Sequence, residues 1–169
     1  LRYDRGRAAN LNAVGIVHYL RGDFERAQPL LEEALVLHQS TGNLKSAGRV
    51  AANVGHLHAA VSRHAEALAL YEQAAALGAK AGDDAGMATA KDGVGNVLQV
   101  QGRYREAIAA FEESLRWADR AGDEQRRGIV QAGRPVIVEI IHTVCPRRMA
   151  LARLHRRGAC LHRQHDVVV

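Results

Sequence analysis

Two kinds of short pattern in this sequence could carry chemistry: a glycine-rich segment and groups of histidine and cysteine. The glycine-rich segment, GVGNVL, begins at Gly93 and starts like a dinucleotide-binding loop. Such a loop needs a third glycine and a preceding β-strand, because its backbone turns sharply against the pyrophosphate. Both are missing, so we expect Gly93 to lie in a helix. No Ser or Lys before residue 130 has a recognisable base or orienting carboxylate, so the sequence predicts no catalysis and no cofactor.

The histidines and cysteines form two groups that could supply zinc ligands. His56 and His58 flank Leu57, so on a helix they point to different sides and cannot share an ion. The second group is near the end of the sequence and comprises His142, Cys145, Cys160, His162 and His165. Nitrogen and sulfur donors suit zinc, but the spacings fit only in part and no fold pattern supports them. The sequence therefore predicts no metal site.

A period of forty residues organises the chain up to about residue 130. One position is always glycine, one is alanine and one is large: Gly15, Gly55 and Gly95, then Ala27, Ala67 and Ala107, then Leu31, Tyr71 and Phe111. Each repeat shows an apolar helical pattern, a tight turn and a second helical pattern. The sequence thus predicts an all-α solenoid with units at about 4–43, 44–83 and 84–123 and the start of a fourth. The first unit would have helices at about 4–20 and 24–40.

The repeated positions also have a predicted role in packing. Glycine within a helix costs about 1 kcal/mol relative to alanine, so its recurrence predicts that the second helix crosses close to the first. The repeated alanines would supply the small face of that second helix, and the repeated large residues would fill the space between units. Gly followed by Asn or Asp recurs at 42–43, 82–83 and 122–123, where Gly favours a helix end and Asn or Asp caps the next helix.

These residues resemble the tetratricopeptide repeat. Val14-Gly15, Val54-Gly55 and Val94-Gly95 stand at the Leu-Gly pair of that family, and the repeated alanines at its first small position. The family's Trp is replaced by Leu11, Ala51 and Lys91, its closing Pro is absent, and the period exceeds the usual one of about thirty-four residues. The long period is similar to that in kinesin light chains and large bacterial signalling regulators. The resemblance implies a right-handed α-solenoid whose function is to bind proteins.

In this family the partner lies on the concave face, which the first helix of each pair forms. The resemblance places a peptide or helix partner against a polar strip, namely Asn12, Ile16, Tyr19, Arg49, Ala52, Asn53, His56, Asp92, Asn96 and Gln99. One subtype holds a C-terminal carboxylate with Lys, Asn and Arg at set positions. Asn53 stands at one of them, but Thr89 and Gly93 replace the basic residues of the third unit, so we expect no such clamp.

The positive charge of the chain belongs to its last part. Residues 1–130 hold sixteen Lys and Arg and sixteen Asp and Glu, whereas residues 131–169 hold seven Arg against Glu139 and Asp166. The repeats therefore carry no electrostatic signature for nucleic acid. Pro135 and Arg147 break the register of a fourth unit. Three explanations stay open for residues 131–169: a divergent cap, a basic arm for an acidic partner or nucleic acid, or an out-of-frame translation.

Several features concern the cellular setting. No apolar run reaches the roughly eighteen residues that a membrane-spanning helix needs. Only Cys145 and Cys160 are present, which favours the cytoplasm over an oxidising compartment. We expect a fragment of a larger bacterial regulator that acts as a protein-interaction module. The alternatives are nucleic-acid binding through the Arg-rich tail and a free-standing assembly scaffold.

Overall fold

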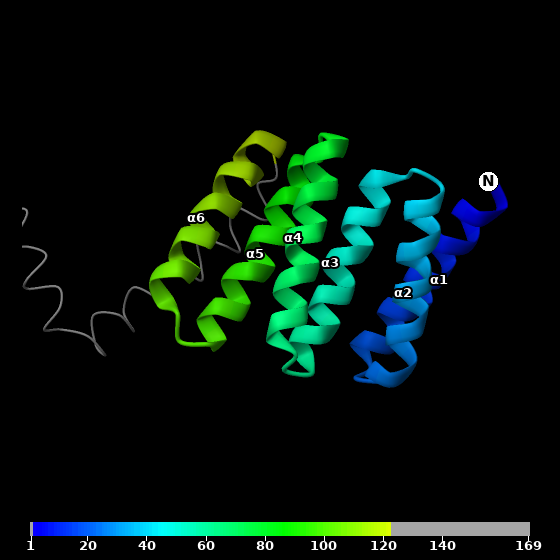
Figure 1. Cartoon of the computed structure of the whole chain (residues 1–169), viewed down its shortest axis with the longest axis horizontal. Coiled ribbons are helices and arrows are strands. Elements are labelled where there is room, and N and C mark those ends of the chain that lie inside the picture. The colour runs from blue at the N-terminus through cyan, green and yellow to red at the C-terminus, as the bar shows by residue number, and fades with distance from the viewer. Residues whose placement is uncertain (1, 123–169) are drawn as a thin grey trace, which may run out of the picture. The chain divides into compact units, whose positions relative to one another are not determined.

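The structure, a computed structural model, describes residues 2–122, and those residues form six α-helices and no β-strand. The helices follow one another along the repeat (Figure 1) as α1 Arg2–Leu20, α2 Phe24–Ser40, α3 Leu44–Ala60, α4 His64–Ala81, α5 Asp84–Val100 and α6 Tyr104–Ala121. The expected all-α class is confirmed, and α1 begins two residues earlier than the sequence indicated. The expectations for residues 123–169, which include the start of a fourth unit and the possible zinc ligands from His142 to His165, lie outside the described residues.

Glycines in the left-handed region end most of these helices. Gly42, Gly82 and Gly122, in the links between units, have φ of 67°, 64° and 68°. Within a pair, the turn from α3 to α4 is different, because Ser62 adopts φ 61° where the other two turns have glycine. A side chain in this region is strained, so Ser62 marks a local departure from the repeat.

Only one of the expected helix caps forms in the described part of the chain. The Asn43 side chain accepts a hydrogen bond from the backbone N–H of Ser46, at 3.3 Å. Asp83 makes no such cap bond. Its carboxylate lies 3.6 Å from Nζ of Lys45 on α3, so it joins neighbouring pairs instead.

The repeated glycines lie where a large side chain of the second helix crosses the first helix. An ideal Cβ at Gly15 would be 2.8 Å from Leu31, and one at Gly95 would be 2.6 Å from Cε1 of Phe111. The predicted close crossing is therefore confirmed. The large residues were expected between units. Tyr71 does lie there, because it packs on Gly93 of the next pair as well as on Gly55 of its own, and Leu31 and Phe111 pack on the glycine of their own pair. The alanines Ala27, Ala67 and Ala107 are fully buried beside them.

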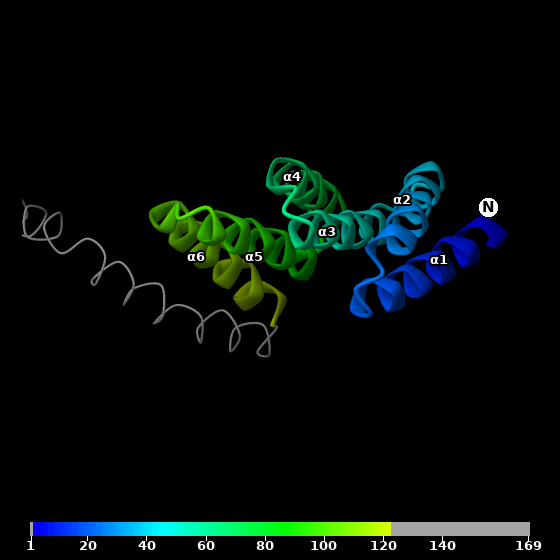
Figure 2. The same ribbon diagram turned by 90° about the horizontal axis from the view of Figure 1, so that it is seen from below.

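The first helices form the inner side of the described repeat. α1 contacts α3, and α3 contacts α5, whereas α2, α4 and α6 make no comparable contact with one another. Seen from below (Figure 2), α2 and α4 lie on one side of α3, away from α1 and α5. The inner faces of α1, α3 and α5 are therefore the place to look for a groove.

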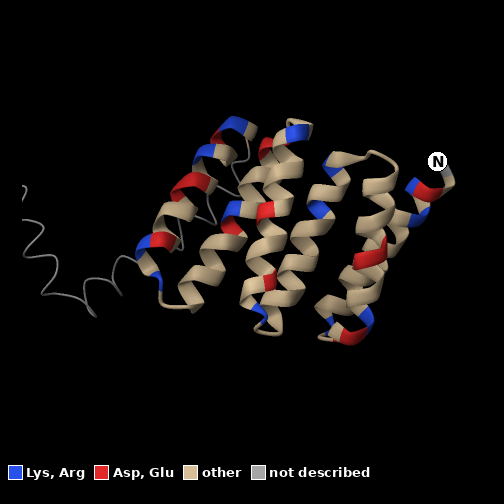
Figure 3. Ribbon diagram, viewed as in Figure 1, with Lys and Arg blue, Asp and Glu red and all other residues tan. Residues whose placement is uncertain are grey.

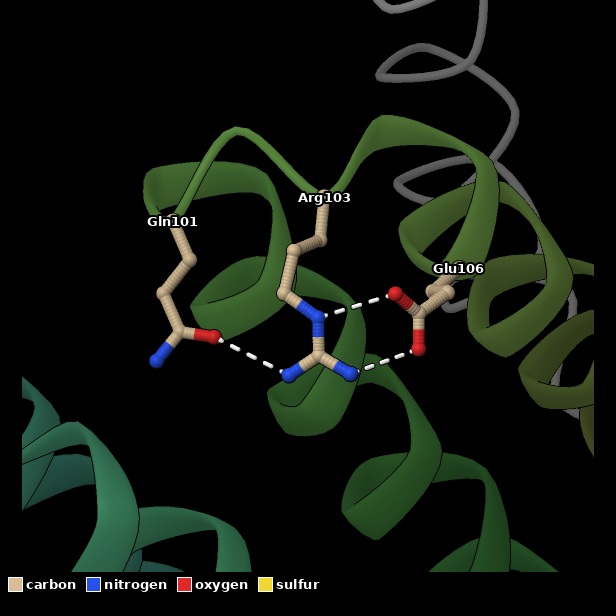
Figure 4. A network of polar contacts seen from close by, with 3 residues as sticks. All are labelled: Gln101, Arg103 and Glu106. Atoms are coloured by element: carbon tan, nitrogen blue, oxygen red, sulfur yellow. Dashed lines mark hydrogen bonds and ion pairs between the residues drawn. The ribbon is translucent and has the colours of Figure 1, made fainter.

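Charged residues are interspersed along the described helices (Figure 3) and form no region of a single sign there. Several pair locally, as in the turn between α5 and α6, where the Arg103 guanidinium lies between Gln101 and Glu106 (Figure 4). Its Nε and Nη2 donate to the two Glu106 oxygens at 2.9 and 2.6 Å, which lowers the pKa of that carboxyl. Both side chains of this ion pair are exposed, so the pair orders the turn more than it stabilises the fold. Within residues 2–122, no helix is long and apolar enough to cross a membrane.

Candidate partner-binding groove

A polar cavity of about 440 Å³ opens on the inner side of the repeat. It draws side chains from four helices and is lined by Ala9, Asn12, Ile16, His38, Ser46, Arg49, Val50, Asn53 and Thr89. Four of the residues predicted for the groove, Asn12, Ile16, Arg49 and Asn53, are thus brought together. Arg49 is the only residue in this lining with a permanent charge. The cavity can therefore offer a guanidinium, amides and hydroxyls to a polar ligand.

A hydrogen bond joins the first two pairs at this cavity. Nδ2 of Asn53 on α3 donates to Oδ1 of Asn12 on α1, at 3.0 Å. Each amide keeps further donor or acceptor capacity for a ligand, because an amide group has two donors and one acceptor oxygen. Ala52 was expected beside them but is 2% exposed, so its side chain packs in the core and offers nothing to a partner.

A second cluster lies around the hydroxyl of Tyr71, which reaches the inner side from α4. This hydroxyl lies 2.8 Å from Nδ1 of His56, and the two rings meet nearly edge-on, with centroids 5.3 Å apart. Burial, with smaller contributions from Tyr19 and Asp92, raises the pKa of Tyr71, so the hydroxyl keeps its proton. One further predicted residue, His56, therefore contacts a residue that the sequence indicated only for packing, and Tyr19 and Asp92 lie near enough to affect the pKa of its hydroxyl.

The remaining predicted residues lie farther along α5. Asn96 is exposed and donates from Nδ2 to Oδ2 of Asp92 at 3.3 Å, one helical turn earlier. Gln99 is half-buried. On α1, Tyr19 packs its ring on Phe24, with centroids 5.8 Å apart, so the ring is already held in place.

Sequence reasoning missed two polar residues of the cavity, His38 and Ser46, and the apolar Ala9 and Val50. His38 is 4% exposed, its Nδ1 has no hydrogen-bond partner among the described residues, and burial lowers its pKa. No repeated pattern could have found it, because the equivalent positions forty residues on are Gly78 and Ala118. Thr89 was considered only as a clamp position, for which it lacks the charge.

The structure also accounts for the motifs that the sequence analysis set aside. Gly93 lies within α5, and a side chain there would overlap the Tyr71 ring, which leaves no space for a phosphate or for a basic clamp residue. His56 contacts Tyr71, whereas His58 is buried, with 8% exposure. Within the described residues, no group of three or more His, Cys, Asp and Glu is placed to hold a metal ion.

A second cavity, of about 460 Å³, lies along α1 outside this groove. Val14 and Leu30 are among the residues that line it, and Val14 is 48% exposed. The equivalent residue of α3, Val54, is 2% exposed. The cavity therefore lies on a face of α1 whose equivalent on α3 is buried by helix packing. None of the predicted groove residues lines it.

Comparisons with known proteins agree with this architecture. Family models described as tetratricopeptide repeat match residues 6–80 and residues 87–116, together more than half of the chain. A comparison with curated protein sequences finds no match.

Solved structures with the same fold come from distant proteins. The N-terminal domain of stress-induced protein-1 (STI-1) from C. elegans is 22% identical with a TM-score of 0.60, and the match covers 76% of this chain and 95% of that one. Aspartyl phosphate phosphatase F from Bacillus subtilis is 11% identical with a TM-score of 0.75, over 96% of this chain and 42% of that one. BtubC from P. vanneervenii is 20% identical with a TM-score of 0.69, over 98% and 66%. At these identities the likeness shows the fold alone.

Proposed function

Because this chain belongs to the tetratricopeptide repeat family, we propose that it binds a peptide or a helix of a partner protein in its inner groove. Repeats of this family generally mediate interactions between proteins and typically act as non-catalytic scaffolds. A function without catalysis is therefore part of the proposal.

The observation that carries this proposal is the polar cavity on the inner side. Asn12 from α1, Arg49 and Asn53 from α3, and Thr89 from α5 line one space, so a single ligand there would touch all three first helices. A groove with amide and guanidinium donors suits backbone carbonyls and polar side chains better than a purely apolar helix face.

The second cluster supports an aromatic anchor at the other end of the strip. Tyr19 is half-buried against Phe24, so its ring would lose little conformational freedom on contact with a partner. Aromatic residues are enriched among those that carry most of the binding energy of an interface. We therefore assign Tyr19 the largest single contribution.

The test begins with a random peptide library displayed on phage and selected against the 169-residue chain. A selected peptide is then titrated by calorimetry into the wild-type protein and into a variant with Tyr19→Ala and Asn96→Ala. We expect the affinity to fall at least about tenfold, which is about 1.4 kcal/mol. Arg49→Ala should weaken binding further, since it removes the charged donor of the cavity.

Arg105→Ala is the matched control, because Arg105 is an exposed arginine on the second helix of its pair, outside the groove. It should leave the affinity unchanged, and far-ultraviolet circular dichroism should be the same for all variants. If the variants with groove substitutions bind the peptide as tightly as the Arg105→Ala variant does, the groove is not the surface that binds the peptide.

We also propose a setting: a regulatory protein of the bacterial cytoplasm. The support is the resemblance of the long repeat to that of bacterial signalling regulators and the low cysteine content. Fractionation of the source cells with an antibody against this chain would test it, and recovery from an oxidising compartment would contradict it.

A further inference from the structure

The two junctions between helical pairs are built differently. We call the contact between the first and second pairs the first junction, and that between the second and third pairs the second junction. The forty-residue register makes Leu31 of the first junction equivalent to Tyr71 of the second, and Asn53 equivalent to Gly93. Equivalent positions thus carry side chains that differ in size and polarity at the two junctions.

An aromatic ring fills the second junction. Tyr71 is 1% exposed, and a Cβ at either Gly55 on α3 or Gly93 on α5 would overlap its ring. The ring is therefore held between the backbones of two pairs, and its hydroxyl is bound at 2.8 Å to His56. Close packing of this kind resists small movements, because every shift loses dispersion contacts on one side or meets a clash on the other.

The first junction is more open and more polar. Leu31 covers Gly15 of its own pair, and Asn53 stands where the second junction has a glycine. The link across the inner side is the hydrogen bond from Asn53 to Asn12, beside the cavity of about 440 Å³. The inner helices also contact each other less at this junction, α1 with α3, than at the second, α3 with α5. A partly exposed hydrogen bond beside open space can lengthen or exchange with water at little cost.

We propose that the repeat bends at the first junction, whereas the second and third pairs move as one rigid body. Bending would change the width of the cavity, because that cavity takes side chains from α1 and α2 on one side of the junction and from α3 on the other. The movement is a property of the chain itself and does not depend on which ligand the groove binds. Its failure would therefore leave the proposed function untouched.

The register provides a matched set of positions for measuring the movement. Val36, Ala76 and Arg116 are equivalent, exposed, and placed on α2, α4 and α6. Spin labels on cysteines at 36 and 76 report the first junction, and labels at 76 and 116 report the second. Cys145→Ser and Cys160→Ser remove the natural thiols. Pulsed electron–electron double resonance then gives the distribution of distances in each doubly labelled protein.

We expect the distribution for 36 and 76 to be clearly broader than that for 76 and 116, by about twofold in width, as for a hinge beside a rigid contact. Equal widths, or a broader distribution for 76 and 116, would overturn the inference.

An exchange of the junction residues tests the cause. Ile16→His, Leu31→Tyr and Asn53→Gly together give the first junction the residues of the second, and should narrow the distribution for 36 and 76. His56→Ile, Tyr71→Leu and Gly93→Asn together do the reverse, and should broaden the distribution for 76 and 116. If an exchanged protein loses its helical circular dichroism, the inference is still tested by comparing the 36–76 and 76–116 distance distributions of the protein without exchanged junction residues. If both exchanged proteins fold and neither width changes, Tyr71 is not the cause and the inference fails.

Discussion

At the scale of single residues, the close approach of two helices depends on the absence of one methyl group. At Gly95 an added Cβ would lie 2.6 Å from Cε1 of Phe111, well inside van der Waals contact. Phe111 is 9% exposed and lies within the α5–α6 pair, so it cannot swing away without opening the core. Glycine therefore persists within this helix despite its poor helix propensity.

Gly95→Leu should lower the free energy of unfolding by about 1–3 kcal/mol through overpacking. Gly6→Leu is the matched control, because Gly6 also lies in a helix but a Cβ added there would meet nothing within 4 Å. That control should be neutral or slightly stabilising, since leucine favours a helix. Urea unfolding of both variants checks this, and equal stabilities would refute the packing explanation.

His38 gives the fold a dependence on pH. Its ring is buried, and burial lowers its pKa below the ordinary value of 6.5. The unfolded chain therefore takes up a proton at a higher pH than the folded chain does. The contribution of His38 to stability is complete above the unfolded pKa and is lost as pH falls through the folded pKa.

We therefore expect the unfolding free energy of the wild-type protein to fall more steeply than that of His38→Ala between about pH 7 and about pH 5. Alanine is the residue at the equivalent position 118, so the substitution fits the repeat. His58 and His64, whose Nδ1 atoms also have no hydrogen-bond partner within residues 2–122, remain in both proteins and cancel in the difference. Parallel curves from urea unfolding across this range would show that His38 is not responsible.

Residue identities alone could predict some of these contacts and not others. The recurrence of Gly15, Gly55 and Gly95 predicts a close crossing, because only contact explains glycine there three times. The contact between Tyr71 and His56 could not be predicted, since it depends on how far a side chain of α4 reaches between α3 and α5. The same holds for Asp83, which pairs with Lys45 instead of capping its own helix.

At the scale of helices, α2 contains one residue that disfavours the helical conformation. Pro29 lies inside α2, is exposed, and stands where α4 and α6 have Ala69 and Ala109. Proline has no N–H for the carbonyl four residues earlier and crowds that turn. The helix forms nonetheless because its other face is buried against α1 and α3.

Pro29→Ala should therefore raise the free energy of unfolding by about 1–3 kcal/mol, without loss of packing at this exposed site. Ala69→Pro is the reciprocal change and should lower it by a similar amount. Thermal and urea unfolding measure both. A destabilising effect of Pro29→Ala would mean that the ring makes a contact important to the pair.

Helix positions could largely be predicted from the sequence, because two signals agree: the forty-residue register and the Gly-Asx links. The bounds of α2 at Phe24–Ser40 follow from them directly. The strip of groove residues was less accessible to prediction. Helical geometry indicates which residues face inward, but Ala52 shows that a neighbouring helix can bury such a position completely.

At the scale of the whole molecule, we propose that residues 131–169 are separate from the repeats in function. Their net charge of +5 contrasts with the neutral balance of residues 1–130. Deleting 131–169 should leave the affinity for the selected peptide unchanged, as measured by calorimetry. If the deletion abolishes binding while Tyr19→Ala with Asn96→Ala does not, the tail carries the function.

The same deletion examines the alternative of nucleic-acid binding. If the affinity for DNA falls steeply with salt concentration and disappears on deletion, residues 131–169 bind the phosphates of DNA. DNA binding that survives the deletion would instead place that role in the repeats, against the interspersed charges of the described helices (Figure 3).

One consequence follows from the way each helix contacts only its neighbours and the next inner helix. Among the described helices, no contact of comparable extent joins α1 or α2 to α6. If residues 2 and 122 were pulled apart, the force would pass through the two junctions in series, because no described helix ties the first pair to the last. The repeat would then lengthen in several small steps at low force, one pair at a time, and recoil as each pair reforms from contacts close in sequence. Such a chain behaves under tension as a soft spring.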